Sequence, residues 1–193
     1  MLEPPAKVQS LMREFPRDWF IAGGWAIDLF LGRQTREHDD IEIAIFRQDQ
    51  IAVQKFLGDW DLRKAENGVL SEWKPGEYLE LPVHAVHCFN ETAELSFLEV
   101  LLNESEDGVW QFRRNRQITK PLSELYLTND SGIRFLRPEI VLLYKSKNPR
   151  AKDEQDFQAV IGHLQPESKK WLKDALSICF AEHHWQQDFQ ENE

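Results

Sequence analysis

Cysteine is scarce in this chain. Cys88 and Cys179 are the only two among 193 residues, and they lie far apart in the sequence. Secreted domains stabilised by disulfides, and metal sites built from several cysteines, need more of them at closer spacing. The scarcity therefore argues against both classes and favours a reducing cytoplasm.

Long apolar runs are also missing. No run approaches the roughly 20 apolar residues that a membrane-spanning helix needs. The N-terminal segment "MLEPPAKVQSLMREF" lacks the apolar core of a secretory signal. We therefore expect a protein that neither spans a membrane nor enters the secretory pathway.

Positive charge is in deficit. The chain has 33 acidic and 23 basic residues, which gives a formal net charge of −10. This balance opposes binding to long nucleic acids or to an anionic membrane surface, because both repel an acidic protein. A small or cationic partner fits the charge better.

The apolar pattern predicts an α/β (α+β) fold, with a mixed β-sheet flanked by helices. A hydrophobic content of 41% allows a chain of this length to bury its own core. From Pro138 onward the pattern is purely helical, so we expect a core over 1–137 and a short C-terminal helical region over 138–193. Strands are expected at 18–23, 40–46, 81–89, 95–102 and 108–114, and helices at 5–14, 25–32, 48–58, 138–147, 152–164 and 166–185.

A glycine pair, Gly23 and Gly24, follows the first expected strand, "DWFIAG". Glycines let the backbone come close to a ligand, and the start of the next helix offers free N–H groups to an anion. The pair therefore predicts a seat for a phosphate group. An ordinary turn at the end of a strand is the alternative.

Acidic residues interrupt the apolar strand "DIEIAIF". Asp40 and Glu42 point to the same side, about 6.6 Å apart at a rise of about 3.3 Å per residue. Because an unpaired buried carboxylate costs several kcal/mol, the pair predicts a cation, and Mg²⁺ prefers carboxylate oxygens. A buried salt bridge to Arg33 or Arg36 is the alternative. Asp39 points to the opposite face and is expected to be solvated or paired.

A third acid, Glu99, stands alone among aliphatic residues in "LSFLEVLL". It can join the metal site or accept a proton from an attacking hydroxyl if its strand lies beside the first acidic strand. A position on an exposed sheet edge is the alternative. Glu104 and Asp107 are weaker candidates because they fall in "NESEDG", which reads as a polar turn with solvated acids.

Other candidate residues have structural interpretations. His38 is expected to make structural hydrogen bonds rather than to bind a ligand. The tryptophans are expected mostly in the core, with Trp73, Trp110 and Trp185 as candidates for lining a substrate cleft.

Together these residues carry a family resemblance. The sequence resembles the nucleotidyltransferase superfamily that includes DNA polymerase beta, and most closely the small bacterial adenylyltransferases that act on aminoglycosides and lincosamides. The close resemblance covers 18–48, with weaker support from "RPEIVLLYKSK" through "KDEQDF". The matching features are Gly23-Gly24-Trp25, Asp28, "GRQTREHDDIEI" and Glu99.

The resemblance implies roles for these positions. It implies that Gly23 and Gly24 open a helix that holds the triphosphate of ATP. It also implies that Asp40, Glu42 and Glu99 bind Mg²⁺. Lys145 matches the family lysine that contacts the triphosphate, and an ordinary surface lysine is the alternative. Many members have aspartate where this chain has Glu42 and Glu99, and glutamate is longer by one methylene.

The implied reaction is transfer of a nucleoside monophosphate, AMP from ATP, to a hydroxyl of a small molecule, with release of pyrophosphate. An aminoglycoside-like antibiotic is the candidate acceptor. Two alternatives stay open. One is a nucleotidyltransferase-type antitoxin or regulator that acts on a protein partner, and the other is a degenerate nucleotide-binding module without turnover.

Overall fold

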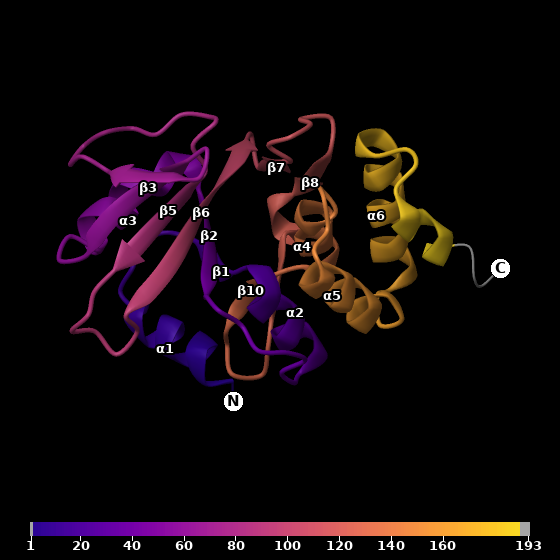
Figure 1. Cartoon of the computed structure of the whole chain (residues 1–193), viewed down its shortest axis with the longest axis horizontal. Helices are drawn as coiled ribbons and strands as arrows, with labels where there is room; N and C mark the ends of the chain where they lie inside the picture. Colours follow the sequence, from indigo (N-terminus) through magenta and orange to yellow (C-terminus); the bar gives the residue numbers. More distant parts are fainter. Residues whose placement is uncertain (1, 190–193) are drawn as a thin grey trace.

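A mixed β-sheet forms the body of the molecule (Figure 1). The computed structural model describes residues 2–189, and all statements below refer to them. The strand order is β4-β3-β5-β6-β2-β1-β10-β9, and β7 and β8 extend the far end of β6. The strands are β1 (Trp19–Ile21), β2 (Glu42–Phe46), β3 (Asp61–Glu66), β4 (Val69–Glu72), β5 (Ala85–Phe89), β6 (Phe97–Glu106), β7 (Val109–Gln111), β8 (Thr119–Pro121), β9 (Tyr126–Thr128) and β10 (Arg134–Leu136).

Helices pack on the sheet and at one end of it. The helices are α1 (Glu3–Leu11), α2 (Gly23–Leu31), α3 (Gln50–Phe56), α4 (Pro138–Lys145), α5 (Ala151–Ile161) and α6 (Pro166–Cys179), with short 3₁₀ turns at η1 (Arg47–Asp49), η2 (Leu122–Glu124) and η3 (His184–Phe189). Figure 1 shows α4, α5 and α6 at the end of the molecule opposite β3 and β5. Helix α2 packs against both α4 and α5. No described helix is long and apolar enough to cross a membrane.

The expected α/β fold with a mixed sheet is confirmed. Strand β2 pairs antiparallel with β1 and parallel with β6, so it is hydrogen-bonded on both edges. Ile43 and Ile45 are buried, as the apolar run of this strand predicts. Pro138 and Pro166 each stand in the first turn of a helix, as expected. The division into a core over 1–137 and a helical region over 138–193 stays a prediction.

The hairpin of β3 and β4 was not predicted. Its strands are largely polar and exposed at the edge of the sheet, so they carry little of the apolar alternation that marks a half-buried strand. The turn between the two strands does have a sequence signal, the dipeptide Asn67-Gly68. Both residues have positive φ, 50° and 79°, as in the two-residue hairpin turns that favour Asn-Gly. That dipeptide predicts the hairpin where hydrophobicity does not.

A buried ion pair corrects the prediction for the segment 103–108. This segment is not simply a polar turn, because β6 continues through it to Glu106. Glu104 accepts a hydrogen bond from Nε of Arg47 at 2.8 Å, and both side chains are mostly buried. Arg47 also donates to the carbonyl oxygens of Leu79, at 3.0 Å, and Val83, at 2.9 Å. The pair thus ties the segment before β5 to η1 and β6.

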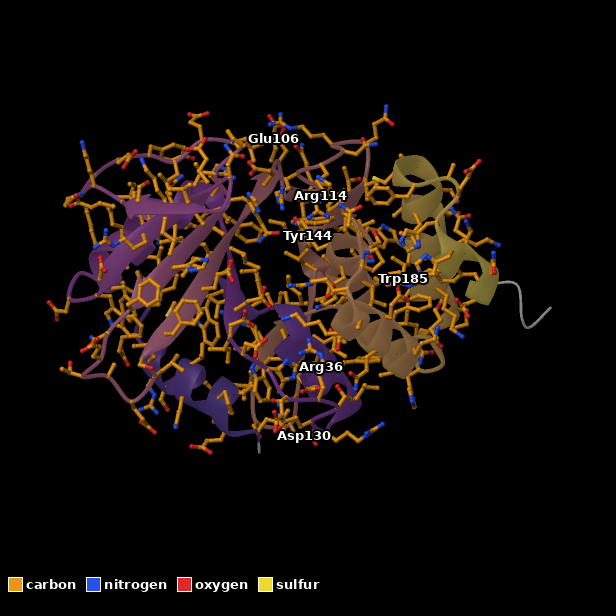
Figure 2. All side chains as sticks on the ribbon, in the orientation of Figure 1. Arg36, Glu106, Arg114, Asp130, Tyr144 and Trp185 are labelled. Atoms are coloured by element: carbon orange, nitrogen blue, oxygen red, sulfur yellow. The ribbon has the colours of Figure 1, made fainter. Side chains whose placement is uncertain are left out.

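We expect Glu104→Gln to lower the free energy of unfolding by about 3 kcal/mol, because it leaves the charge of Arg47 buried without its counter-ion. Glu106→Gln is the matched control, since Glu106 is exposed at the edge of the molecule (Figure 2) and its loss of charge should cost less than about 0.5 kcal/mol. Urea denaturation of both variants measures the difference. Equal stabilities would contradict the role assigned to Glu104.

Candidate active site

Two of the predicted acids lie side by side on the sheet. Glu42 begins β2, Glu99 lies on β6, and the parallel pairing of these strands places the two residues directly opposite each other. The backbone N–H of Glu99 donates to the carbonyl oxygen of Ile41 at 3.0 Å, which fixes this register. Asp40 lies just before β2 begins. The condition for a role of Glu99 in the site, that its strand lies beside the first acidic strand, is therefore met.

Burial and neighbouring negative charges raise the pKa of two of these acids, Glu99 and Glu42. Burial, followed by the charges of Glu42 and Asp40, raises the pKa of Glu99 to about 8. Burial, followed by the charge of Asp40, also raises the pKa of Glu42. The positive charges of Lys145 and Lys152 act in the opposite direction on Glu42 without outweighing burial. The site therefore opposes ionisation of these two acids, and a nearby cation would favour it.

The nearby basic residues are paired with other acids. Nε and Nη2 of Arg36 lie 2.8 and 2.9 Å from the two carboxylate oxygens of Asp156, so Arg36 does not neutralise Asp40 or Glu42 as the salt-bridge alternative required. Nζ of Lys145 lies 3.0 Å from the same carboxylate. The described ion pairs include none between Arg33 and either acid. The alternative of a buried salt bridge is therefore wrong.

Asp39 behaves as predicted. Its carboxylate is 90% exposed and lies 3.4 Å from Nζ of Lys152. It therefore points away from the acids of the sheet and is both solvated and paired, which makes it a useful reference for the buried acids beside it.

The side chains gathered at the site are of the type that binds a hard divalent cation. The three predicted ligands are carboxylates, which Mg²⁺ prefers, and their repulsion would be relieved by such an ion. Glu99 has a weak contact with His87, whose Nε2 lies 3.7 Å from the carboxylate. Within residues 2–189 no three acidic, histidine or cysteine side chains already converge on one point at metal-binding distance. Side chains would therefore have to rotate for the three acids to share an ion.

The glycine pair makes room for the side chains around the acids. Gly23 has φ +57°, and a Cβ atom there would lie 1.3 Å from Oε2 of Glu42. A Cβ atom on Gly24 would lie 2.4 Å from Nη2 of Arg36 and 2.5 Å from Nδ1 of His38. A side chain at either position would therefore displace the groups packed there, and the positive φ of Gly23 itself favours glycine. The first turn of α2 is thereby brought directly against Glu42, and a phosphate-binding role for the pair stays a prediction.

A buried hydrogen-bond network orders the loop before β2. Nε2 of His38 lies 2.5 Å from Oδ2 of Asp28, and the hydroxyl of Thr35 donates to Oδ1 at 2.6 Å. Burial raises the pKa of Asp28, but the hydrogen bonds from His38 and Thr35 outweigh it, so the pKa is lowered overall. The ring of His38 lies 4.3 Å from that of Trp25, whose Nε1 donates to the carbonyl oxygen of Asp40 at 3.0 Å. The structural role expected for His38 is confirmed, and the network holds the backbone of Asp40.

A cavity of about 310 Å³ opens beside the acids. Its lining includes both Glu42 and Glu99, together with Gly23 at the start of α2 and Lys145 at the end of α4. Lys145 is held by Asp153, whose Oδ1 lies 2.9 Å from its Nζ. The expected metal, phosphate and lysine positions therefore share one cavity, with Asp40 just outside its lining.

Basic residues from beyond the predicted motifs also line this cavity. They come from the segment after β7 and from the connection between α4 and α5, and they are Arg113, Arg114, Lys147 and Arg150. In the sequence, Arg113 and Arg114 could have been noticed as a basic dipeptide directly after "VWQF". Three tryptophans considered for the cleft are buried in the core, as expected of most tryptophans here, and do not line this cavity: Trp73, Trp110 and Trp185.

Part of the sequence is similar to curated aminoglycoside nucleotidyltransferases. A 2''-aminoglycoside nucleotidyltransferase of Escherichia coli is 41% identical over 56 residues, and so is one of Klebsiella pneumoniae. The match covers 28% of this chain and 32% of each relative, so the chain matches about a third of the length of these curated relatives.

Two solved structures share the fold. The structure of ANT(2'')-Ia in complex with adenylyl-2''-tobramycin superposes with a TM-score of 0.60 at 17% identity, covering 90% of this chain and 95% of that one. Lincomycin-bound LnuA, a lincosamide antibiotic adenylyltransferase, gives a TM-score of 0.59 at 20% identity, covering 85% and 99%. At these identities the likeness shows the fold alone.

A family model spans most of the sequence. The model for aminoglycoside-2''-adenylyltransferase matches residues 6–158, which include the glycine pair, all three acids and Lys145. The resemblance drawn from the motifs is thus confirmed, and the chain belongs to the aminoglycoside-2''-adenylyltransferase family.

Proposed function

We propose that this protein transfers AMP from ATP to a hydroxyl group of a small molecule and releases pyrophosphate. The pairing of Glu42 with Glu99 across two parallel strands carries this proposal, because it gathers uncompensated acids in a cavity at the start of α2. Membership of an adenylyltransferase family supports the same reaction class. The scarcity of cysteine supports the cytoplasm as its compartment.

In this proposal Asp40, Glu42 and Glu99 hold Mg²⁺. The ion, when bound, would neutralise charge on the phosphates and orient them for in-line attack. The first turn of α2 would offer backbone N–H groups to the triphosphate. Glu99 is either the third ligand or the base that accepts the proton of the attacking hydroxyl, and its raised pKa suits a proton acceptor near neutral pH.

Lys145 would provide a positive charge for the triphosphate. Its ammonium group now bridges Asp153 and Asp156, which keeps it in the cavity in a defined position. Contact with phosphate would use the remaining hydrogen-bonding capacity of the ammonium group. The ion pairs therefore support a preorganised cation, not a free surface lysine.

The acceptor is a small hydroxylated molecule. An aminoglycoside-like or lincosamide-like antibiotic is the first class to test, since the relatives are named for these substrates. Pyrophosphate release from each of the four nucleotides, measured against a panel of hydroxylated antibiotics and metabolites, tests the proposal. Magnesium-dependent ATP binding without turnover on any acceptor would instead favour a degenerate nucleotide-binding module.

We expect Glu42→Gln to abolish transfer while leaving the fold nearly intact, because the amide keeps the size of the side chain but loses the charge that binds the metal. Asp40→Asn should have the same effect. Asp39→Asn is the matched control, since this neighbouring acid is exposed and points away from the site. Retention of transfer in both test variants, within a few-fold of the parent, would remove these acids from the site.

We expect Glu99→Gln to lower single-turnover transfer by roughly 10²- to 10⁴-fold, the range of a positioned proton acceptor. Calorimetric binding of ATP with Mg²⁺ separates the two roles of this residue. Unchanged binding assigns Glu99 as the base, and a parallel loss of binding assigns it as a ligand. Parental values in both measurements would exclude it from the active site.

We expect Gly23→Ala to impair transfer, because the added methyl group must displace the carboxylate of Glu42. Gly32→Ala is the control: Gly32 also has positive φ, +69°, but a Cβ atom there meets nothing within 4 Å. Both variants should carry a similar backbone strain of about 1 kcal/mol. Equal activity of the two folded variants would contradict the close fit between Gly23 and Glu42.

A further inference from the structure

Two adjacent arginines form a basic wall of the cavity. Arg113 and Arg114 follow β7 and both line the cavity that holds the acids. Their guanidinium carbons lie 5.7 and 5.6 Å from the centre of the Tyr144 ring, and Nη1 of Arg114 donates to the carbonyl oxygen of Tyr144 at 2.8 Å. Figure 2 shows Arg114 beside Tyr144, between the strands and the C-terminal helices. Both guanidinium groups are thus held against α4 rather than extended into solvent.

The positive charge of this pair is not neutralised by the protein. Among the ion pairs of residues 2–189, none joins Arg113 or Arg114 to a carboxylate. Glu104 attracts Arg113, but its carboxylate is bound by Arg47. Burial, followed by the charge of Arg114, lowers the pKa of Arg113, so the two like charges are held together at a cost. An oxyanion bound between them would offset that cost.

The basic wall lies apart from the acids. Asn103, which accepts a hydrogen bond from the Tyr144 hydroxyl at 3.2 Å, is four positions after Glu99 on β6. That spacing corresponds to about 13 Å along the strand. The cavity thus has an acidic end and a separate basic end.

We propose that Arg113 and Arg114 form an oxyanion-binding subsite at the basic end of the cavity. Paired guanidinium groups bind phosphate or carboxylate oxygens by charge-assisted hydrogen bonds. Two sources can supply the oxyanion in the proposed reaction: an anionic group on the acceptor, or the terminal phosphates of the nucleotide. An acceptor that fills the subsite would carry a carboxylate or phosphate group besides its reacting hydroxyl, so hydroxylated acids and sugar phosphates join the antibiotics as acceptors to test. This refinement of the substrate rests on the proposed function, whereas the subsite itself does not.

The test is calorimetric titration of the nucleotide-free protein with inorganic phosphate. We expect the Arg113→Gln/Arg114→Gln double variant to bind phosphate at least about tenfold more weakly than the parent. Arg113→Lys/Arg114→Lys should retain part of the binding because it keeps both charges. Arg116→Gln is the matched control, since Arg116 is exposed on the same segment and does not line the cavity. If the double variant does not fold, Arg113→Gln alone serves, because Arg114 keeps its bond to the Tyr144 carbonyl oxygen.

A second phosphate titration shows whether the bound oxyanion comes from the acceptor or from the nucleotide. In it, the protein is first saturated with Mg²⁺ and a non-hydrolysable ATP analogue. Phosphate binding that persists assigns the subsite to the acceptor, and binding that is lost assigns it to the nucleotide phosphates. Absence of phosphate binding by the parent, or equal binding by parent and double variant, would overturn the subsite. Failure of the analogue itself to bind would count against the proposed function while leaving the phosphate result standing.

Discussion

The repulsion between carboxylates on neighbouring parallel strands is the constraint on which the site depends. The register of β2 and β6 sets Glu42 opposite Glu99, and burial prevents water from screening their charges. A fold selected for stability alone would place apolar residues or a counter-ion there. The cations in the vicinity are instead held by other acids, as Arg36 is by Asp156. The cost of ionising these acids without a cation is what favours a cation-binding, nucleotide-transferring site here.

The rest of the site follows from fitting backbone and side chains around those acids. Gly23 lets the first turn of α2 approach Glu42, so the positive end of a helix meets the carboxylate and any phosphate bound beside it. The pair formed by Asp28 and His38 fixes the preceding loop, and Trp25 holds the backbone of Asp40. Side chains with no direct part in the proposed chemistry therefore determine where the reacting groups lie.

The sequence predicted those parts of the protein that have a local pattern. The apolar run around Glu42 and the isolation of Glu99 predicted two buried acidic strands, and their pairing followed once the topology was known. Contacts between distant segments could not be predicted in this way. Glu104 looked solvated because its partner, Arg47, is remote in sequence. Arg113 and Arg114 stand out in the sequence as a basic dipeptide, but their place in the cavity depends on how β7 extends β6. Local spacing identifies the chemical groups, whereas long-range packing determines which of them meet.

Paramagnetic broadening of amide NMR signals by Mn²⁺, in the presence of ATP, tests the central claim most directly. Because Mn²⁺ also prefers oxygen ligands, it can replace Mg²⁺ at a carboxylate site. We predict that the signals of Glu42 and Glu99 broaden first, ahead of that of Glu106, an exposed acid at the far end of β6. Broadening centred on surface acids, with the signals of β2 and β6 unaffected, would contradict the assignment of the metal and nucleotide to this cavity.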